Sequence, residues 1–130
     1  MCDEHNDLSL QLYDEACKKI HAGDFADAIQ LFRRSLELEV NYKSLLHLGR
    51  CYLELGQYRE AIVPLAAATT LNGQGIAPYN LAIVMQNLGD LNFALKLSEL
   101  AVARQPDLRR ARILMEEIKM KLEEQKNSLE

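Results

Sequence analysis

Residues 45–68 read LLHLGRCYLELGQYREAIVPLAAA and contain two apolar segments joined by a short turn. In each segment, small or apolar residues recur every three or four positions, which places them on one face of a helix. Gly56 lies between the segments, and glycine is the residue type found most often just after a helix. The stretch therefore predicts two helices that form a hairpin.

The same turn occurs three times in the chain. Each copy is a glycine followed by a polar and then an apolar residue, and successive copies are 33 residues apart. The copies are Gly23-Asp24-Phe25, Gly56-Gln57-Tyr58 and Gly89-Asp90-Leu91. A fixed period of this length is typical of proteins built from stacked hairpins.

Small residues recur at one position in each of the six helices of the three predicted hairpins. They allow the two helices of a hairpin to approach closely, while larger residues fill the seams on either side. The three pairs are Ala16 with Ala28, Gly49 with Ala61, and Ala82 with Ala94. The apolar pattern and the breaks predict seven helices, at about 7–22, 25–39, 42–55, 58–71, 76–88, 91–104 and 107–126.

The repeat resembles the tetratricopeptide repeat. The middle copy fits the pattern Leu45-x2-Leu48-Gly49-x2-Tyr52 followed by Ala61-x3-Leu65-x2-Ala68, and the flanking copies follow it more loosely. The resemblance implies an all-α solenoid of three helix–turn–helix repeats that forms a right-handed superhelix. The expected parts are a tail at 1–7, repeats at 8–41, 42–74 and 75–107, a capping helix at 108–126 and a tail at 127–130.

In this family the first helices of successive hairpins line a concave groove that binds peptides. Carrying the repeat register over to this chain predicts the groove residues. They are Tyr13, Cys17, Lys43, Leu46, His47, Arg50, Ile76, Tyr79, Asn80, Ile83, Arg109 and Arg112, together with Leu10, Ile20, Glu54 and Asn87. The mixture of apolar and polar side chains suits peptide capture, in which anchors fill pockets and hydrogen bonds set the register.

One subset of the family binds acidic C-terminal tails through five Lys, Asn and Arg side chains. The matching positions here hold Tyr13, Cys17, His47, Ile76 and Asn80, so that mode is disfavoured. A different cationic site, made of Arg50, Asn80, Arg109 and Arg112, could bind a carboxylate through charge-assisted hydrogen bonds. The alternative is that each arginine lies along the helix surface.

Composition and charge exclude several other classes. The net charge of −4 argues against nucleic acid, which requires a surplus of Lys and Arg. No apolar run approaches the roughly 20 residues of a membrane span. The three cysteines have no CxxC spacing, so they predict no disulfide framework and favour a cytoplasmic location.

The sequence gives little support for a metal site or for catalysis. Cys17 and His21 are four residues apart, as are His47 and Cys51, and the four side chains together would suit zinc. The register instead turns Cys51 into a helix seam, where cysteine is a small apolar filler. No phosphate loop, nucleophile elbow or HExxH pair is present, so we expect neither an enzyme nor a cofactor.

The sequence thus predicts a protein-binding adaptor, scaffold or chaperone-like module. Two alternatives stay open at this point. One is a structural protein that self-associates weakly through the exposed ends of the array. The other is a small secretion-type chaperone, which rests on analogy of fold.

Overall fold

The computed structural model describes residues 2–129, and side chains from residue 7 onward. This part of the chain forms seven helices and no strand. The helices are α1 (Cys2–His21), α2 (Phe25–Leu38), α3 (Tyr42–Glu54), α4 (Tyr58–Leu71), α5 (Ile76–Asn87), α6 (Leu91–Arg104) and α7 (Arg109–Ser128). The predicted all-α class is confirmed.

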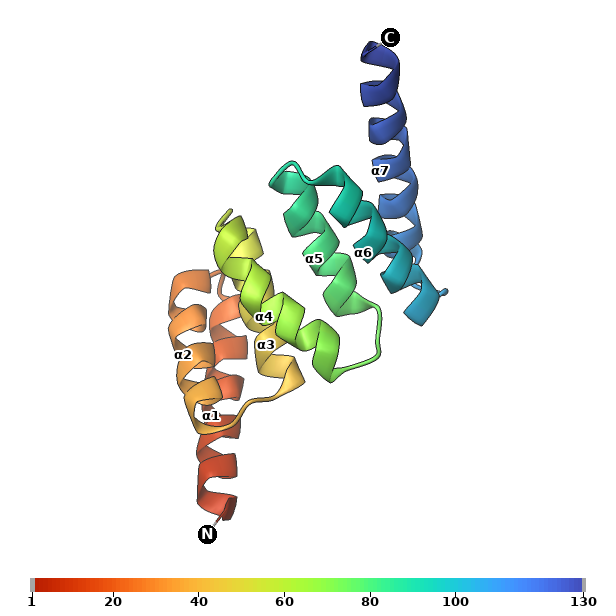
Figure 1. The fold of residues 1–130 in the computed structure, drawn as a ribbon. Helices are drawn as coiled ribbons and strands as arrows, with labels where there is room; N and C mark the ends of the chain where they lie inside the picture. Colours follow the sequence, from red (N-terminus) through yellow and green to blue (C-terminus); the bar gives the residue numbers. More distant parts are fainter. Residues whose placement is uncertain (1, 130) are drawn as a thin grey trace.

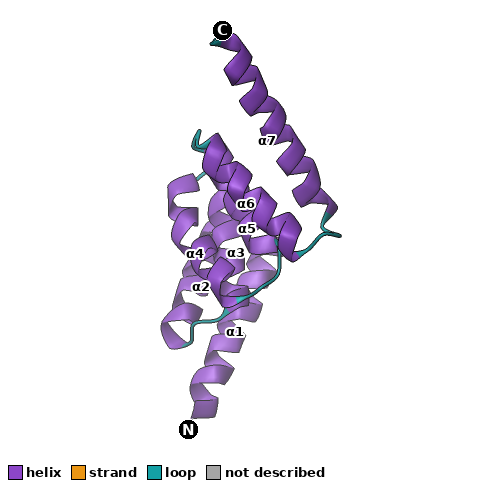
Figure 2. Cartoon of the chain, turned by 45° about the vertical axis from the view of Figure 1, so that its right-hand side comes forward, coloured by secondary structure: helices purple, strands orange, loops and turns teal. Residues whose placement is uncertain are grey.

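The helices form three hairpins that stack in chain order (Figure 1). The hairpins are α1–α2, α3–α4 and α5–α6; α2 packs on α3, and α4 packs on α5. Helix α7 packs on α6 and α5, and its C-terminal end extends past them (Figures 1 and 2). The termini lie at opposite ends of the molecule, as expected for an open solenoid.

Each hairpin turns on a glycine with positive φ, where a side chain would be strained. Gly23, Gly56 and Gly89 have φ values of 77°, 73° and 90°. The residue after each glycine donates its N–H to a carbonyl five positions earlier, as in Gln57 to Tyr52 at 2.8 Å. This bond closes the helix end in a Schellman motif, so the 33-residue sequence period is also a period of the backbone.

The small residues mark the points where paired helices touch. Ala16, Ala28, Ala61, Ala82 and Ala94 are all fully buried. Gly49 is buried too, and a Cβ added to it would overlap the side chain of Leu65 across the α3–α4 contact. The expected reason for small residues at these positions is confirmed.

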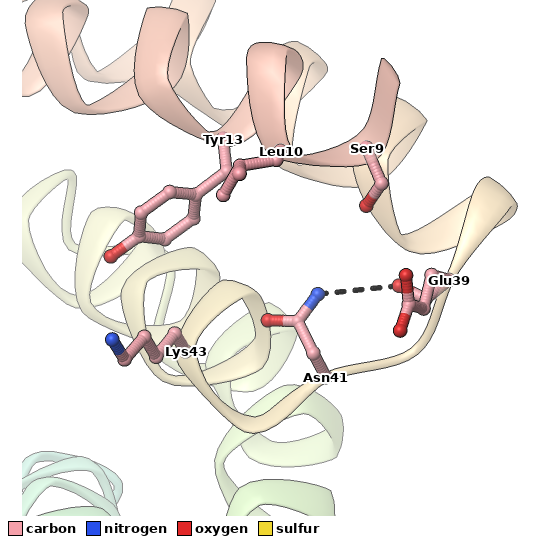
Figure 3. Close-up of a pocket in the computed structure, with 6 residues that line it drawn as sticks. All are labelled: Ser9, Leu10, Tyr13, Glu39, Asn41 and Lys43. Atoms are coloured by element: carbon pink, nitrogen blue, oxygen red, sulfur yellow. Dashed lines mark hydrogen bonds between the residues drawn. The ribbon is translucent and has the colours of Figure 1, made fainter. Parts of the chain in front are cut away.

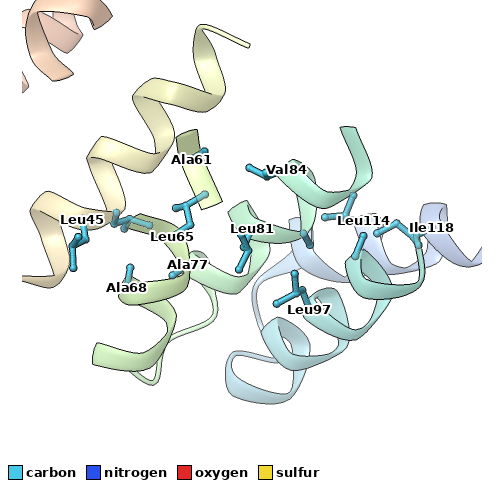
Figure 4. Close-up of a cluster of buried hydrophobic side chains, with 13 residues drawn as sticks. Leu45, Ala61, Leu65, Ala68, Ala77, Leu81, Val84, Leu97, Leu114 and Ile118 are labelled. Carbon is cyan, nitrogen blue, oxygen red and sulfur yellow. The ribbon is translucent and has the colours of Figure 1, made fainter. Parts of the chain in front are cut away.

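Two apolar clusters form the core. One lies between α1, α2 and α3 around Phe32 and Leu48, and the other runs from α3 to α7 around Leu65, Leu81 and Ile118 (Figure 4). Because α7 contributes Leu114 and Ile118 to the second cluster, it covers the end of the array as the sequence predicts.

Two local predictions differ from the structure. Helix α1 begins at Cys2, five residues earlier than predicted, and α7 spans Arg109–Ser128 because Pro106 and Asp107 lie in the preceding turn. Pro64 lies buried within an uninterrupted α4, although a helix interior usually disfavours proline.

None of the helices within residues 2–129 has the length and apolar character that a membrane span requires.

Candidate functional site

Four helices carry one continuous surface, which we call the inner face. The rings of Tyr13 on α1 and His47 on α3 lie 5.8 Å apart, and α3 in turn packs on α5. The guanidinium of Arg110 on α7 lies 5.4 Å from the centre of the Tyr79 ring on α5. The inner face is therefore formed by α1, α3, α5 and α7, which are the helices that the repeat register assigns to the groove.

Fourteen of the sixteen predicted groove residues are at least partly accessible. Lys43, Arg50, Arg109 and Arg112 are exposed, whereas Tyr13, Cys17, His47, Ile76, Tyr79 and Ile83 are half-buried. Helix α5 contains no charged residue. The inner face thus has an apolar centre on α5 and basic groups on both sides of it.

The other two predicted groove residues are buried, which corrects their assignment. Leu46 is 9% exposed and belongs to the core cluster, and Asn80 is 5% exposed. Asn80 lies on α5, which packs against α3, α4, α6 and α7, so little of this helix reaches the surface. The Asn80 side-chain nitrogen makes no hydrogen bond within the described residues.

Three rings pack together where α1, α2 and α3 meet. Phe32 is fully buried, the His47 ring stacks on it at 5.8 Å and 15°, and the Tyr13 ring meets it edge-on at 5.9 Å. We call Tyr13, Phe32 and His47 the aromatic cluster. Because Phe32 is fixed in the core, it holds the two inner-face rings in place.

Two hollows lie on either side of the aromatic cluster. The first, of about 300 Å³, lies between the middle of α1 and the start of α3 and is lined by Ser9, Leu10, Tyr13, Glu39, Asn41 and Lys43 (Figure 3). Figure 3 shows Tyr13 reaching from α1 toward α3, where its ring lies over Lys43. The Asn41 side chain caps α3 by accepting a hydrogen bond from the Ser44 N–H.

The second hollow, of about 320 Å³, lies between the ends of α1 and α3 and the start of α2. It is lined by Cys17, Ile20, His21, Phe25, His47, Arg50, Cys51 and Glu54. The walls are mainly apolar, and Arg50 and Glu54 supply charges of opposite sign. These two hollows are therefore suited to receive apolar side chains beside charged groups.

The predicted cationic site is divided in the structure. Arg109 and Arg112 line a shallow hollow on α7 together with Ile113, Glu116 and Met120. Arg50 instead borders the second hollow on α3, and Asn80 is buried between the two regions. The arginines and Asn80 therefore do not converge on one carboxylate.

The two cysteine–histidine pairs line the second hollow but do not form a metal cage. His21 Nδ1 lies 2.7 Å from the Cys17 carbonyl oxygen, and the His47 ring stacks on Phe32. Within the described residues, no group of three or more potential ligands is arranged to hold a metal ion. Burial raises the pKa of the Cys51 thiol to about 11, so this sulfur stays protonated and packs as an apolar group.

Comparison with known proteins matches residues 19–74 to the tetratricopeptide repeat. The match covers the central turn and the close α3–α4 contact, which the structure repeats on both sides. The chain is a tetratricopeptide repeat protein. No curated protein matches the sequence.

Several solved structures share the fold of this tetratricopeptide repeat protein. One is the Yersinia enterocolitica type III secretion chaperone SycD in complex with a peptide of the translocator YopD. It is 25% identical to this chain with a TM-score of 0.83, and the match covers 88% of this chain and 95% of SycD. SycD in an alternative dimer is 27% identical with a TM-score of 0.81, covering 90% and 96%. The first repeat domain of Spaghetti (RPAP3), bound to the HSP90 peptide SRMEEVD, is 19% identical with a TM-score of 0.85, covering 89% and 94%.

Arg110 is an inner-face residue that the predicted groove does not include. The repeat period could have identified this residue. Ser44, Ala77 and Arg110 are 33 residues apart, so they occupy the same position in successive repeats. Ser44 and Ala77 are fully buried. The period therefore places Arg110 beside α5, where its guanidinium lies over the Tyr79 ring in a cation–π contact.

His47 makes the stability of this repeat protein depend on pH. Burial lowers the pKa of His47, and the positive charges of Arg50 and Lys43 lower it further. The rings of Tyr13 from α1 and Phe32 from α2 also face it. A histidine with a depressed folded-state pKa contributes stability that is fully present above the unfolded pKa and is lost as the pH falls through the folded pKa.

We therefore expect the free energy of unfolding to fall more steeply with acid in the wild type than in a His47→Gln variant. Urea denaturation of both proteins at roughly pH 7.5 and pH 5.5, on either side of the ordinary histidine pKa, measures the difference. His21→Gln, at an exposed position, is the matched control and should keep the wild-type pH dependence. Equal pH dependence of wild type and His47→Gln would contradict the assigned burial.

Proposed function

We propose that this tetratricopeptide repeat protein is a non-catalytic module that binds a peptide segment of a partner protein on its inner face. The observation that carries the proposal is the pair of hollows beside the aromatic cluster, bordered by Lys43 and Arg50. Neither cation forms an ion pair within the described residues. Both are therefore available to carboxylates of a ligand.

The chemistry of the inner face suits a segment with apolar and acidic side chains. Ile76, Tyr79 and Ile83 present apolar surface on α5, while exposed bases lie on the neighbouring helices α3 and α7. Because the helices are fixed by the core, binding would order little of the protein itself, which limits the entropic cost. The peptide-bound states of SycD and of the RPAP3 domain support this mode of action by analogy of fold.

Selection of peptides from a displayed random 12-residue library tests the proposal. Tyrosine and arginine are frequent hot spots, so the Arg50→Ala, Tyr79→Ala double variant should bind the selected peptides at least about tenfold more weakly. The control is Arg33→Ala, Phe93→Ala, which removes an arginine and an aromatic ring from exposed positions on α2 and α6. Failure to select any peptide, or equal affinity of wild type and the inner-face variant, would refute the proposal.

A secretion-type chaperone is a second candidate, and the similarity to SycD favours it. The similarity extends over nearly the full length of both chains at 25–27% identity. In this function the inner face would hold a segment of a partner before its export. Light scattering over a range of protein concentrations would separate either function from the self-associating alternative, because only the latter requires a mass that rises with concentration.

A further inference from the structure

The two hollows on the inner face have a defined spacing along α1 and α3. Their lining residues are centred roughly eight positions apart on each helix, for example from Lys43 to Arg50 and Cys51 on α3. At 1.5 Å per residue, the centres of the hollows lie about 12 Å apart. Tyr13 and His47 meet between them, so the two hollows are separate rather than one trough.

We infer that the ligand is an extended segment with two apolar anchor side chains four positions apart, lying along the seam between α1 and α3. This inference rests on the proposed function and specifies its ligand. An extended chain advances about 3.3 Å per residue, so four residues span about 13 Å. Its side chains alternate in direction, so residues i and i+4 point to the same side, whereas i and i+3 do not.

The walls of each hollow fit an apolar anchor. The first hollow has Leu10, which is 59% exposed, beside the ring of Tyr13. The second has Ile20 and Phe25 beside the protonated sulfur of Cys51. Neither hollow has a buried charge, so an aliphatic side chain enters each one without leaving an unpaired charge behind.

The charges at the rims indicate the residues that flank the anchors. Each hollow is bordered by one base and one acid, Lys43 and Glu39 at the first and Arg50 and Glu54 at the second, and all four side chains are exposed. Along the chain the two bases lie between the two acids, so the stretch between the hollows is bordered by the bases. Carboxylates placed between the anchors would lie near both cations and gain charge-assisted hydrogen bonds. The ligand class is therefore a short acidic segment with two aliphatic residues in an i, i+4 arrangement.

The extended form is favoured over a helical one by the contact between Tyr13 and His47. A helix is about 10–12 Å wide with its side chains and needs a continuous trough between two neighbouring helices. The two rings close that space midway, with their centres 5.8 Å apart. An extended main chain is narrower and can cross this contact with its anchors on either side of it.

Synthetic peptides with a Gly-Ser-Asp background and two leucines test the inference. The leucines are placed three, four, five or seven positions apart, and a single-leucine peptide is included. Fluorescence anisotropy should show at least about tenfold tighter binding of the i, i+4 peptide than of the i, i+3 and single-leucine peptides, as expected when a second leucine side chain is buried. Tightest binding of the i, i+7 peptide would show a helical ligand and overturn the inference, as would equal affinity at every spacing.

Variants of the two hollows complete the test. Cys17→Phe fills the second hollow and Leu10→Ser removes the apolar wall of the first, so each should abolish the advantage of the second leucine. Lys18→Phe, at an exposed position on α1, should preserve it. Leu10 is on the surface, so its variant remains informative if Cys17→Phe does not fold.

The library-selected peptides show whether a negative result rules out only the inferred ligand or also the proposed function. If they bind the inner face but the two-leucine peptides do not, the inference is wrong and the proposed function stands. If neither set binds, both are wrong.

Discussion

Replacing Gly49 by leucine should destabilise the protein by about 3 kcal/mol, near the upper end of the cost of overpacking a core. A Cβ at this position already overlaps the Leu65 side chain, and leucine adds three further carbons at the point where α3 and α4 touch. The gain in helix propensity over glycine, about 1 kcal/mol, offsets only part of this cost. Urea denaturation followed by circular dichroism measures the change.

Gly73→Leu is the matched control for this substitution. A Cβ at Gly73 meets nothing within 4 Å, and the residue has no positive φ. The same chemical change at this open position should alter the stability by about 0.5 kcal/mol or less. If the two variants were equally stable, the close approach of α3 and α4 would not be the reason for a glycine at position 49.

Much of the fold can be predicted because it depends on local signals that recur. Glycines at 23, 56 and 89 each end a helix by adopting a positive φ, and few other residues do so without strain. The small residues opposite one another follow from the same period. The start of α1 was not predictable in this way, because residues 2–7 have no apolar period and no glycine to mark a boundary.

The candidate site was less predictable, because its properties depend on contacts between helices. The repeat register identified the helices of the inner face, and most of the predicted residues are accessible there. It could not show that α5 is enclosed by four neighbouring helices, which is why Asn80 is buried. It also could not show that Phe32, a core residue of α2, supports both Tyr13 and His47.

The structure also separates the charges that the sequence analysis grouped into one cationic site. Arg50 borders the second hollow, whereas Arg109 and Arg112 lie on α7 beside two glutamates. Net charge and register gave no information on this separation, because it is set by how α7 packs across α5 and α6. For the proposed peptide ligand, this separation favours contacts at several spaced points over one cationic clamp.

Replacing Phe32 by alanine should have the largest effect, a loss of about 3–5 kcal/mol, which is usual for a phenylalanine removed from a core. Phe32 is fully buried between the first two hairpins and contacts both inner-face rings. Its removal leaves a cavity and also removes the support of Tyr13 and His47. Urea denaturation measures the loss, and Phe93→Ala, at a position that is 42% exposed on α6, should cost less than about 1 kcal/mol.

The aromatic cluster also makes a milder variant informative about binding. Phe32→Leu keeps an apolar side chain in the core, so it should cost about 1.5 kcal/mol and leave the protein folded. The leucine cannot stack on His47, so the two rings between the hollows lose their fixed positions. We therefore expect peptides selected on the wild type to bind Phe32→Leu more weakly while binding Phe93→Leu normally. Unchanged affinity of the folded Phe32→Leu variant would mean that the aromatic cluster stabilises the hairpins but does not shape the inner face.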